Sequence, residues 1–203
     1  MTAVALIIVA SVLGFLSFFE PCTIATHTLF SVRAHARPWP ACCRELFVLW
    51  FTRSLLVTGL LAVAVLLTPP PVWGAVLPSV ILATMASVYI VSRFVYLPVP
   101  HLEFHRLLPD GDRLPAAVQL GLTLPACTLP LFVIVFGMAI TLDSYALAAA
   151  GGLLFASLFT LPTAVAAVTG LSAAGQRFLK ASALATSYLT AGLLYAAAIY
   201  LLL

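Results

Sequence analysis

Charged side chains are scarce in this sequence. Lys, Arg, Asp and Glu together make up 7% of its 203 residues, whereas 64% of the residues are hydrophobic. A soluble domain carries about 25% charged residues, so this chain has too few of them to cover a surface that faces water. The small net charge of +3 and the lack of a basic run also exclude an electrostatic surface for nucleic acid. The composition therefore predicts an integral membrane protein.

Several motifs of catalysis are also missing. There is no phosphate-binding loop, no HExxH zinc motif and no arrangement typical of a serine–histidine triad. The first apolar segment, residues 2–19, has no basic region before it, and no small-residue cleavage site stands out after it. We therefore expect a retained membrane helix here rather than a cleaved signal, and we expect neither a cofactor nor a resident metal.

Long apolar stretches fill most of the chain. A membrane-spanning helix needs about 20 mostly apolar residues, because a rise of about 1.5 Å per residue has to cross about 30 Å of hydrocarbon. The stretches that meet this requirement are residues 3–30, 46–67, 72–95, 116–140, 145–169 and 181–203. The sequence thus predicts an all-α membrane protein with six transmembrane helices.

The basic residues predict how these helices are oriented. With six helices, all nine basic residues fall on one side of the membrane: Arg33, Arg37, Arg44 and Arg53 in the first connector region, Arg93, Arg106 and Arg113 in the third, and Arg177 and Lys180 in the fifth. The positive-inside rule makes this side cytoplasmic and places both termini outside the cytoplasm.

Two halves of equal helix number flank a central polar loop. Residues 1–96 form a first three-helix repeat, residues 97–115 a cytoplasmic loop, and residues 116–203 a second repeat of one membrane domain. Because three spans is an odd number, the second half enters the membrane in the opposite sense, which is the geometry of an inverted repeat. Transporters built in this way place their site at the interface of the repeats near mid-membrane.

Each half carries a cysteine close to proline. Cys22 follows Pro21 in the first expected helix, and Cys127 lies between Pro125 and Pro130 in the fourth. Each proline removes a backbone donor and clashes with the carbonyl one turn back, so we expect helices one and four to be broken there. The dipole of the second half-helix favours a thiolate at its start, and thiolates attack disulfides. The alternative is a chance co-occurrence of two common residue types.

A family resemblance follows from these residues. With Pro21-Cys22 in helix one, Cys-Thr-Leu-Pro at 127–130 in helix four, six spans and both ends outside, the chain resembles the CcdA family. That family corresponds to the membrane domain of the disulfide reductase DsbD. The chain departs from the family pattern at Ala25 and Ala126, where the family usually has proline.

The resemblance implies a thiol:disulfide oxidoreductase-type electron transporter in a bacterial or archaeal cytoplasmic membrane. Its catalytic residues would be Cys22 and Cys127, joined in a reversible disulfide. It would accept electrons from cytoplasmic thioredoxin and pass them to an extracytoplasmic thioredoxin-like protein that serves cytochrome c maturation or disulfide reduction. Such a disulfide requires Cα atoms about 4.4–6.8 Å apart, so helices one and four must touch.

Glu20 and His27 are candidate supporting residues near Cys22. A carboxylate in an apolar span is costly, and Glu20 either accepts or relays a proton when Cys22 is reduced, or faces an aqueous cavity, or pairs with Arg53 or a backbone donor. His27 has the chemistry to assist exchange. We expect it rather to mark the cytoplasmic end of the first helix, where its polar tip meets water.

Adjacent cysteines leave other functions open. Cys42 and Cys43 are expected in the cytoplasmic connector before helix two, where thiols stay reduced. Thiolates bind soft metal ions, so a soft-metal or small-solute transporter that uses Cys22 with Cys42 and Cys43 is the alternative to electron transfer. Adjacent cysteines alone lack the spacing of metal ligands, however, and the simpler interpretation is two small residues near a helix start. A membrane assembly factor without chemistry is a third hypothesis.

The central loop contains a second pattern of possible metal ligands. His101 and His105 are spaced so that a helix would place both imidazoles on one face, with Glu103 between them. Prolines at 98, 100 and 109 argue against a regular helix here. We therefore expect a solvated loop.

Overall fold

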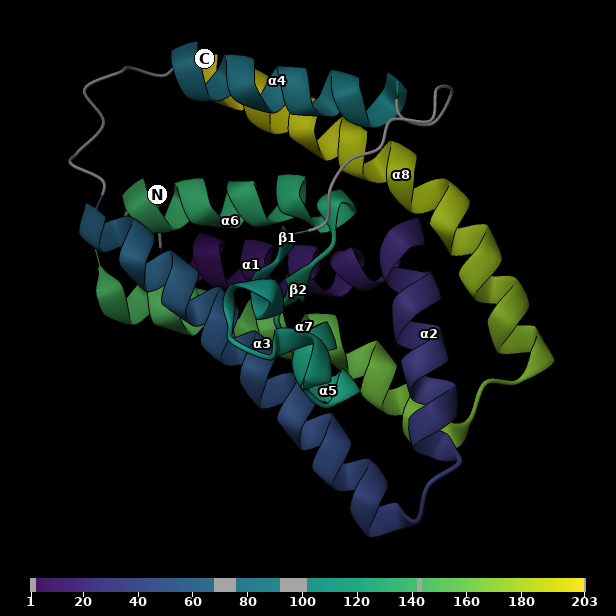
Figure 1. Cartoon of the computed structure of the whole chain (residues 1–203). Coiled ribbons are helices and arrows are strands. Elements are labelled where there is room, and N and C mark those ends of the chain that lie inside the picture. The colour runs from purple at the N-terminus through teal and green to yellow at the C-terminus, as the bar shows by residue number, and fades with distance from the viewer. Residues whose placement is uncertain (1–2, 68–75, 92–101, 142–143, 203) are drawn as a thin grey trace.

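The computed structural model describes residues 3–67, 76–91, 102–141 and 144–202 (Figure 1). The α-helices in these ranges are α1 (Ala3–Phe18), α2 (Pro21–His35), α3 (Trp39–Leu67), α4 (Val76–Val91), α5 (Ala116–Gly121), α6 (Leu129–Thr141), α7 (Tyr145–Thr169) and α8 (Ala173–Leu202). Short elements link α4 to α6: the strands β1 (Leu102–Glu103) and β2 (Thr123–Leu124), and the 3-10 helices Phe104–Leu107, Gly111–Arg113 and Ala126–Thr128. The described chain is therefore mostly helical.

Two of these helices are long and apolar enough to cross a membrane. They are Trp39–Val63 within α3 and Tyr145–Thr169, which is α7, each with 25 residues. At about 1.5 Å per residue each reaches about 37 Å, more than the hydrocarbon core of a bilayer. α1 and α2 pass the same test together but are bent by 72° at the break between them, as in a broken span or a re-entrant loop. The described residues thus contain two candidate spans, or three if the bent pair is one span, which is compatible with a membrane protein.

Several helix boundaries differ from the apolar stretches that predicted them. The expected stretch 145–169 coincides with α7, but α3 begins at Trp39 rather than residue 46 and α8 begins at Ala173 rather than 181. Helices end where their backbone is capped, whereas hydropathy marks only their apolar part. At the start of α8, for example, the Ser172 hydroxyl accepts a hydrogen bond from the Gly175 N–H at 3.1 Å. Residues 72–75 and 92–95 of the expected third helix lie outside the described residues.

α7 is at the centre of the helix packing. α1 and α3 both pack along it, while α6 packs against α1 and α4 packs against α8 (Figure 1). Glycine allows the close approach on both sides of α7, since a Cβ at Gly14 of α1 would lie 2.8 Å from Phe155 Cα. A Cβ at Gly152 of α7 would lie 2.9 Å from Thr58 Cα in α3. Small residues at such contacts are typical of helices that pack in membranes.

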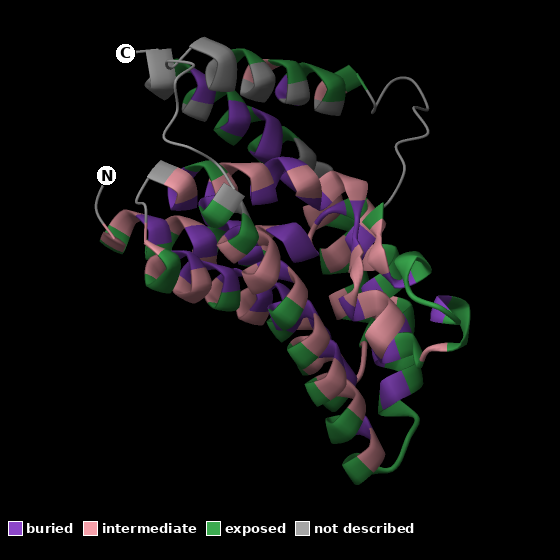
Figure 2. Cartoon of the chain, turned by 60° about the vertical axis from the view of Figure 1, so that its left-hand side comes forward, coloured by how far each residue is buried: buried purple, intermediate pink, exposed green. Residues whose placement is uncertain are grey.

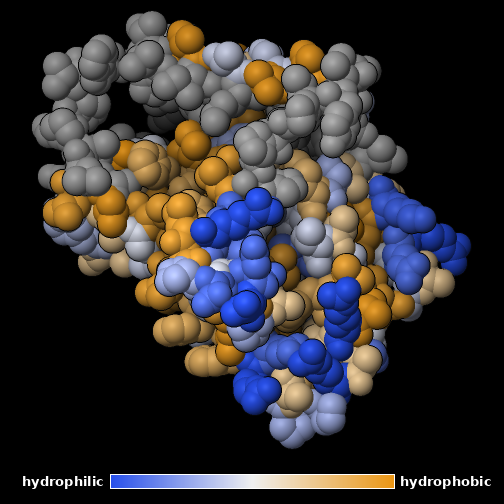
Figure 3. Space-filling model, viewed as in Figure 1, coloured by the Kyte–Doolittle hydropathy of each residue, from blue (hydrophilic) through white to orange (hydrophobic). Residues whose placement is uncertain are grey.

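The surface of the molecule is divided into apolar and hydrophilic parts. Large hydrophobic side chains are exposed on several helices, among them Ile8 of α1, Leu55 of α3 and Phe178 of α8. Hydrophilic residues gather over three places, the connection of α2 to α3, the segment from β1 to α5, and the start of α8 (Figure 3). Extended exposed apolar surface of this kind marks a contact with lipid or with another protein.

Polar side chains are buried where the bent helices meet the rest of the bundle. Buried residues recur along several helices, including α1, α2 and α7, between residues of intermediate or full exposure (Figure 2). The buried polar and charged side chains include Ser17, Glu20, Thr23, His27, Ser31, Arg53, Thr128, Thr160, Thr163 and Thr190. Buried polar groups of this kind require hydrogen-bond partners, and their partners define the candidate site described below.

Candidate functional site

The first helix break lies directly before Cys22. Glu20 has an extended backbone, with φ −67° and ψ 139°, and Pro21 is the first residue of α2. A residue before proline is held in this extended region, and proline suits the first helical position because the N–H there has no helical partner. The Glu20 carbonyl then accepts the N–H of Ile24 at 2.9 Å, which begins the helix. Cys22 therefore lies in the first turn of α2.

The second break is longer and lies before and around Cys127. α5 ends at Gly121, β2 follows, and Pro125 leads in an extended conformation (φ −59°, ψ 140°) into the 3-10 helix that contains Cys127. The N–H and the hydroxyl of Thr128 both donate to the Pro125 carbonyl, at 2.9 and 2.8 Å. Pro130 occupies the first turn of α6, where a missing N–H costs little. Cys127 thus lies just before the second half-helix, as Cys22 lies at the start of α2.

Cys22 and Cys127 lie next to each other despite a sequence separation of 105 residues. Their Cα atoms are 6.5 Å apart and the structure joins their Sγ atoms in a disulfide. This Cα distance is within the range of about 4.4–6.8 Å that a disulfide requires. α2 and the 3-10 helix Ala126–Thr128 are in contact, so the two segments that carry the cysteines touch.

Glu20 is fully buried at the first break. Its Oε1 accepts a hydrogen bond from the Thr190 hydroxyl of α8 at 2.7 Å. Thr190 is itself fully buried, so this bond connects the start of α2 to the last helix of the chain in an environment shielded from solvent. The Glu20 carboxyl group thus lies two residues before Cys22 and is enclosed by protein.

His27 does not meet water, and the expectation that it marks the end of the first helix is wrong. α2 continues to His35, so His27 lies in the middle of the helix and is fully buried. Its Nε2 is 2.8 Å from Arg53 Nη2 and its Nδ1 is 3.0 Å from the Thr23 carbonyl. Because a guanidinium can only donate, Nε2 is the acceptor, and Nδ1 carries the hydrogen that is donated to Thr23. Two hydrogen bonds thus select a neutral tautomer.

Arg53 is also placed differently from the expectation. The distribution of basic residues predicts it in the first connector region, but it lies within α3 and is fully buried. Besides His27, it donates from Nη2 to the Leu120 carbonyl at 3.0 Å and from Nη1 to the Thr160 hydroxyl at 3.3 Å. Its Cζ lies 4.2 Å from the centroid of the Phe159 ring. These partners come from α2, α5 and α7, and together they replace the water that a buried cation loses.

The signal for Arg53 was present in the sequence. A charged residue inside an apolar stretch marks a functional position by default, and Arg53 lies within the stretch 46–67. The positive-inside rule instead groups Arg53 with the basic residues of the first connector region. Thr160 and Thr190 carried no such signal, since threonine is unremarkable in a membrane helix and acquires meaning only through its partner.

Cys42 and Cys43 lie in the first turns of α3 and not in a connector, because α3 begins at Trp39. Cys42 is buried in an apolar cluster with Ala34 of α2, while Cys43 is exposed. Ala34 is about 18 Å along α2 from Cys22 at about 1.5 Å per residue, so the structure does not bring Cys42 to Cys22. Among the residues that the structure describes, no group of three or more His, Cys, Asp and Glu side chains is placed to hold a metal ion.

The central loop is folded against the segment that leads to Cys127. β1 and β2 pair antiparallel, with Leu102 opposite Leu124 and Glu103 opposite Thr123. His105 is buried, so the expectation of a fully solvated loop is wrong at this residue. The expected partner His101 lies outside the described residues. This loop therefore forms part of the wall beside the second break.

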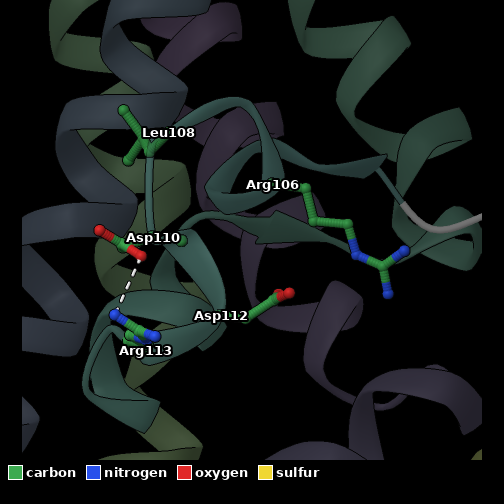
Figure 4. A pocket seen from close by; sticks show the side chains of 6 residues that line it. Arg106, Leu108, Asp110, Asp112 and Arg113 are labelled. Carbon is green, nitrogen blue, oxygen red and sulfur yellow. Dashed lines mark ion pairs between the residues drawn. The ribbon is translucent and has the colours of Figure 1, made fainter.

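The outer side of the same loop is charged. A shallow hollow is lined by Arg106, Leu108, Asp110, Gly111, Asp112 and Arg113 (Figure 4). Asp110 and Arg113 form an exposed ion pair at 3.3 Å, drawn as a dashed line, and Arg106 pairs with Glu103. Exposed pairs of this kind contribute at most about 1 kcal/mol, so the hollow is best described as a polar surface and not as an enclosed site.

Comparisons of the chain with protein-family models, with curated proteins and with solved structures give no match. The resemblance to the CcdA family therefore rests on features of the sequence alone. Function has to be inferred from the geometry of these two cysteines and of the buried polar residues beside them.

Proposed function

We propose that this chain is a transmembrane thiol–disulfide electron carrier. It passes reducing equivalents from cytoplasmic thioredoxin to an extracytoplasmic thioredoxin-like protein through a reversible Cys22–Cys127 disulfide. One observation carries the proposal: two cysteines from different halves of the chain have Cα atoms 6.5 Å apart, Cys22 in the first turn of α2 and Cys127 in the 3-10 helix just before α6. Irregular backbone inside a membrane is tolerated where it lines a site, and the breaks before Cys22 and around Cys127 support the proposal in this way.

The proposed chemistry consists of two thiol–disulfide exchanges. A thioredoxin thiolate attacks one sulfur of the Cys22–Cys127 disulfide, the disulfide bond breaks, and a mixed disulfide forms while the other cysteine leaves as a thiolate. The second thioredoxin thiol resolves the mixed disulfide, so thioredoxin is oxidised and this chain holds two thiols. In the second exchange, one thiolate of this chain attacks the disulfide of the outer partner, and the other resolves the mixed disulfide. The partner is thereby reduced and the Cys22–Cys127 disulfide forms again. Thioredoxin, at about −270 mV, is reducing enough to drive transfer to a more oxidising partner.

We further propose that residues 1–96 and 116–203 form inverted repeats with six spans. The helix contacts support this because they occur in matching pairs. α1 and α2 pack on α7 as α5 and α6 pack on α3, and α2 contacts α8 as α6 contacts α4. Exchanging the two halves maps the first member of each pair onto the second, as an inverted repeat requires.

The proposed orientation places both termini outside the cytoplasm of a bacterial or archaeal cell. The hydrophilic surface over the α2–α3 connection, the β1–α5 segment and the start of α8 would then face the cytoplasm (Figure 3). The basic residues of these segments include Arg37, Arg106 and Arg177. This is the side that the positive-inside rule selects.

The test is thiol trapping in membranes from a strain that expresses the Cys42→Ser/Cys43→Ser chain. The probe is a thioredoxin without its resolving cysteine, whose remaining cysteine carries a thionitrobenzoate group. A thiolate of the carrier displaces this group, so release of the coloured thiol reports formation of a mixed disulfide. We expect both Cys22→Ser and Cys127→Ser to trap the probe, and the double variant Cys22→Ser/Cys127→Ser to trap none.

The same experiment separates the competing functions. If neither single variant traps a thioredoxin, the electron-carrier proposal is wrong. If in addition Cys42→Ser/Cys43→Ser abolishes uptake of a soft metal ion, the chain is a metal transporter. A membrane assembly factor would tolerate the loss of every one of these cysteines.

A further inference from the structure

Arg53 contacts both broken helices from one position in α3. Its Nη2 lies 2.8 Å from His27 Nε2 in α2 and 3.0 Å from the Leu120 carbonyl near the end of α5. His27 follows Cys22 by five residues, and Leu120 precedes Cys127 by seven. One guanidinium thus joins the half-helix that carries Cys22 to the segment that leads to Cys127.

The surroundings of Arg53 hold the guanidinium in place. Its Nη1 donates to the Thr160 hydroxyl of α7 at 3.3 Å, and its Cζ lies 4.2 Å from the Phe159 ring centroid. The His27 ring stacks on the same Phe159 ring, with 5.4 Å between centroids. A planar guanidinium with several fixed donors is suited to joining such partners, whereas an ammonium is a point charge on a flexible stem. α7 therefore acts as the support for this contact.

A glycine at the end of α5 allows this helix to lie close to α3. Gly121 follows Leu120, and a Cβ at Gly121 would overlap the Thr52 side chain and lie 3.2 Å from the Leu49 carbonyl. Only glycine allows α5 to come this close to α3. The last carbonyls of a helix lack helical partners, and Arg53 supplies a charged donor to the one at Leu120.

We propose that Arg53 is a positioning residue for the cysteine pair. By joining α2 to the end of α5, it sets how closely Cys22 and Cys127 approach when the disulfide is open, and so sets the effective concentration of one thiol at the other. It acts through His27 and Leu120, whose elements carry the cysteines. The role rests on the proposed electron carrier, but the equilibrium between the two thiols and their disulfide can be measured without any partner protein.

The experiment measures this equilibrium against glutathione. The Cys42→Ser/Cys43→Ser chain in lipid nanodiscs is equilibrated with buffers of defined glutathione ratio, and free thiols are counted by a mass-adding maleimide. Arg53→Met keeps a long side chain but removes every donor. We expect an effective concentration at least about tenfold lower, which corresponds to a potential about 30 mV more oxidising.

A matched control comes from the same pair of helices. Trp50 Nε1 of α3 donates to the Ser157 hydroxyl of α7 at 3.0 Å, a bond that involves neither α2 nor α5. Trp50→Phe removes this bond and is expected to leave the potential unchanged. An equal shift in Trp50→Phe would show that any loss of α3–α7 contact has the effect, and would overturn the specific role of Arg53.

Two further variants keep the inference testable if Arg53→Met does not fold. His27→Leu removes only the acceptor on α2, and Arg53→Lys keeps the charge without the planar fork. Both are expected to shift the potential in the oxidising direction by less than Arg53→Met. Unchanged potentials in these folded variants would overturn the inference while leaving the electron carrier intact. A wild-type pair that never equilibrates with glutathione would instead overturn both.

Discussion

The Thr190 hydroxyl of α8 donates a 2.7 Å hydrogen bond to the buried carboxylate of Glu20, at the break between α1 and α2. This bond places α8 beside the residue that directly precedes the helix of Cys22. A buried carboxylate next to a cysteine can serve proton transfer or structure, and these two roles predict different results for conservative substitutions.

Glu20→Gln separates these roles, because glutamine retains an oxygen that accepts from Thr190 but cannot take up a proton. We expect disulfide exchange with thioredoxin to slow at least about tenfold and its pH profile to change between about pH 6 and 8, since a positioned acid or base contributes on this scale or more. The measurement is the rate of exchange in nanodiscs across this range. Thr190→Val is the control, which removes the hydrogen bond and keeps the carboxyl group. A rate and profile equal to those of the wild type would return Glu20 to a structural role.

We expect electron transfer to require Cys22 and Cys127 but neither Cys42 nor Cys43. In vesicles loaded with thioredoxin, its reductase and NADPH, Cys22→Ser or Cys127→Ser should reduce transfer to an external disulfide substrate to the background of empty vesicles. Exchange requires both sulfurs, because the second must resolve the mixed disulfide. Cys42→Ser/Cys43→Ser should transfer near the wild-type rate, since Cys42 lies in an apolar cluster at the other end of α2. Loss of transfer in that variant would point to a relay through α3.

Gly14 is expected to be critical for stability. A Cβ there would lie 2.5 Å from the Phe155 carbonyl oxygen, and backbone atoms cannot yield as a flexible side chain can. We expect Gly14→Ala to force α1 away from α7 and to lower the free energy of unfolding by about 1–3 kcal/mol, the usual effect of overpacking. Thermal unfolding in detergent measures the change.

Gly59→Ala is the matched control for Gly14→Ala. Nothing lies within 4 Å of a Cβ built at Gly59 in α3, so the added methyl group meets open space. Alanine is favoured over glycine within a helix by about 0.8–1.0 kcal/mol, and this variant should be neutral or more stable. Equal losses in the two variants would contradict the close packing of α1 on α7.

The loop from β1 to α5 is expected to be accessible to trypsin from the cytoplasmic side alone. Its exposed Arg106 and Arg113 offer cleavage sites. Inverted membrane vesicles should therefore yield fragments that end at these residues, and right-side-out cells should not. Fragments obtained only from right-side-out cells would reverse the proposed orientation.

Gln119 should control how readily this loop opens. Its Nε2 donates to the carbonyls of Asp112 at 2.9 Å and Leu114 at 3.0 Å. Losing about 1 kcal/mol of hydrogen bonding in Gln119→Ala would raise the open population, and the cleavage rate with it, about fivefold. Gln176→Ala, at the start of α8, is the control and should be cleaved in this loop at the wild-type rate. Equal rates in the two variants would show that Gln119 does not hold the loop.

Composition and proline placement are enough to predict apolar helices and the start of α2. Scarce charge and long apolar stretches predict apolar helices, because these properties depend on composition and not on neighbours, and the bounds of α7 coincide with the expected stretch 145–169. Pro21 predicts the start of α2, because proline restricts its own backbone and that of the residue before it. Six spans and inverted repeats remain predictions.

The surroundings of the cysteines, in contrast, depend on contacts between distant parts of the chain. Arg53 and His27 were expected at the cytoplasmic side, and they are fully buried against each other. Their environment depends on Phe159 and Thr160, which lie more than 100 residues further along the chain, and no local pattern contains this information. The mean hydropathy of a stretch stays high when the stretch contains a single arginine. It does not show whether that arginine is exposed to water or buried among hydrogen-bond partners. Long-range packing settles that question, because a buried charge is stable only where distant segments supply its hydrogen bonds.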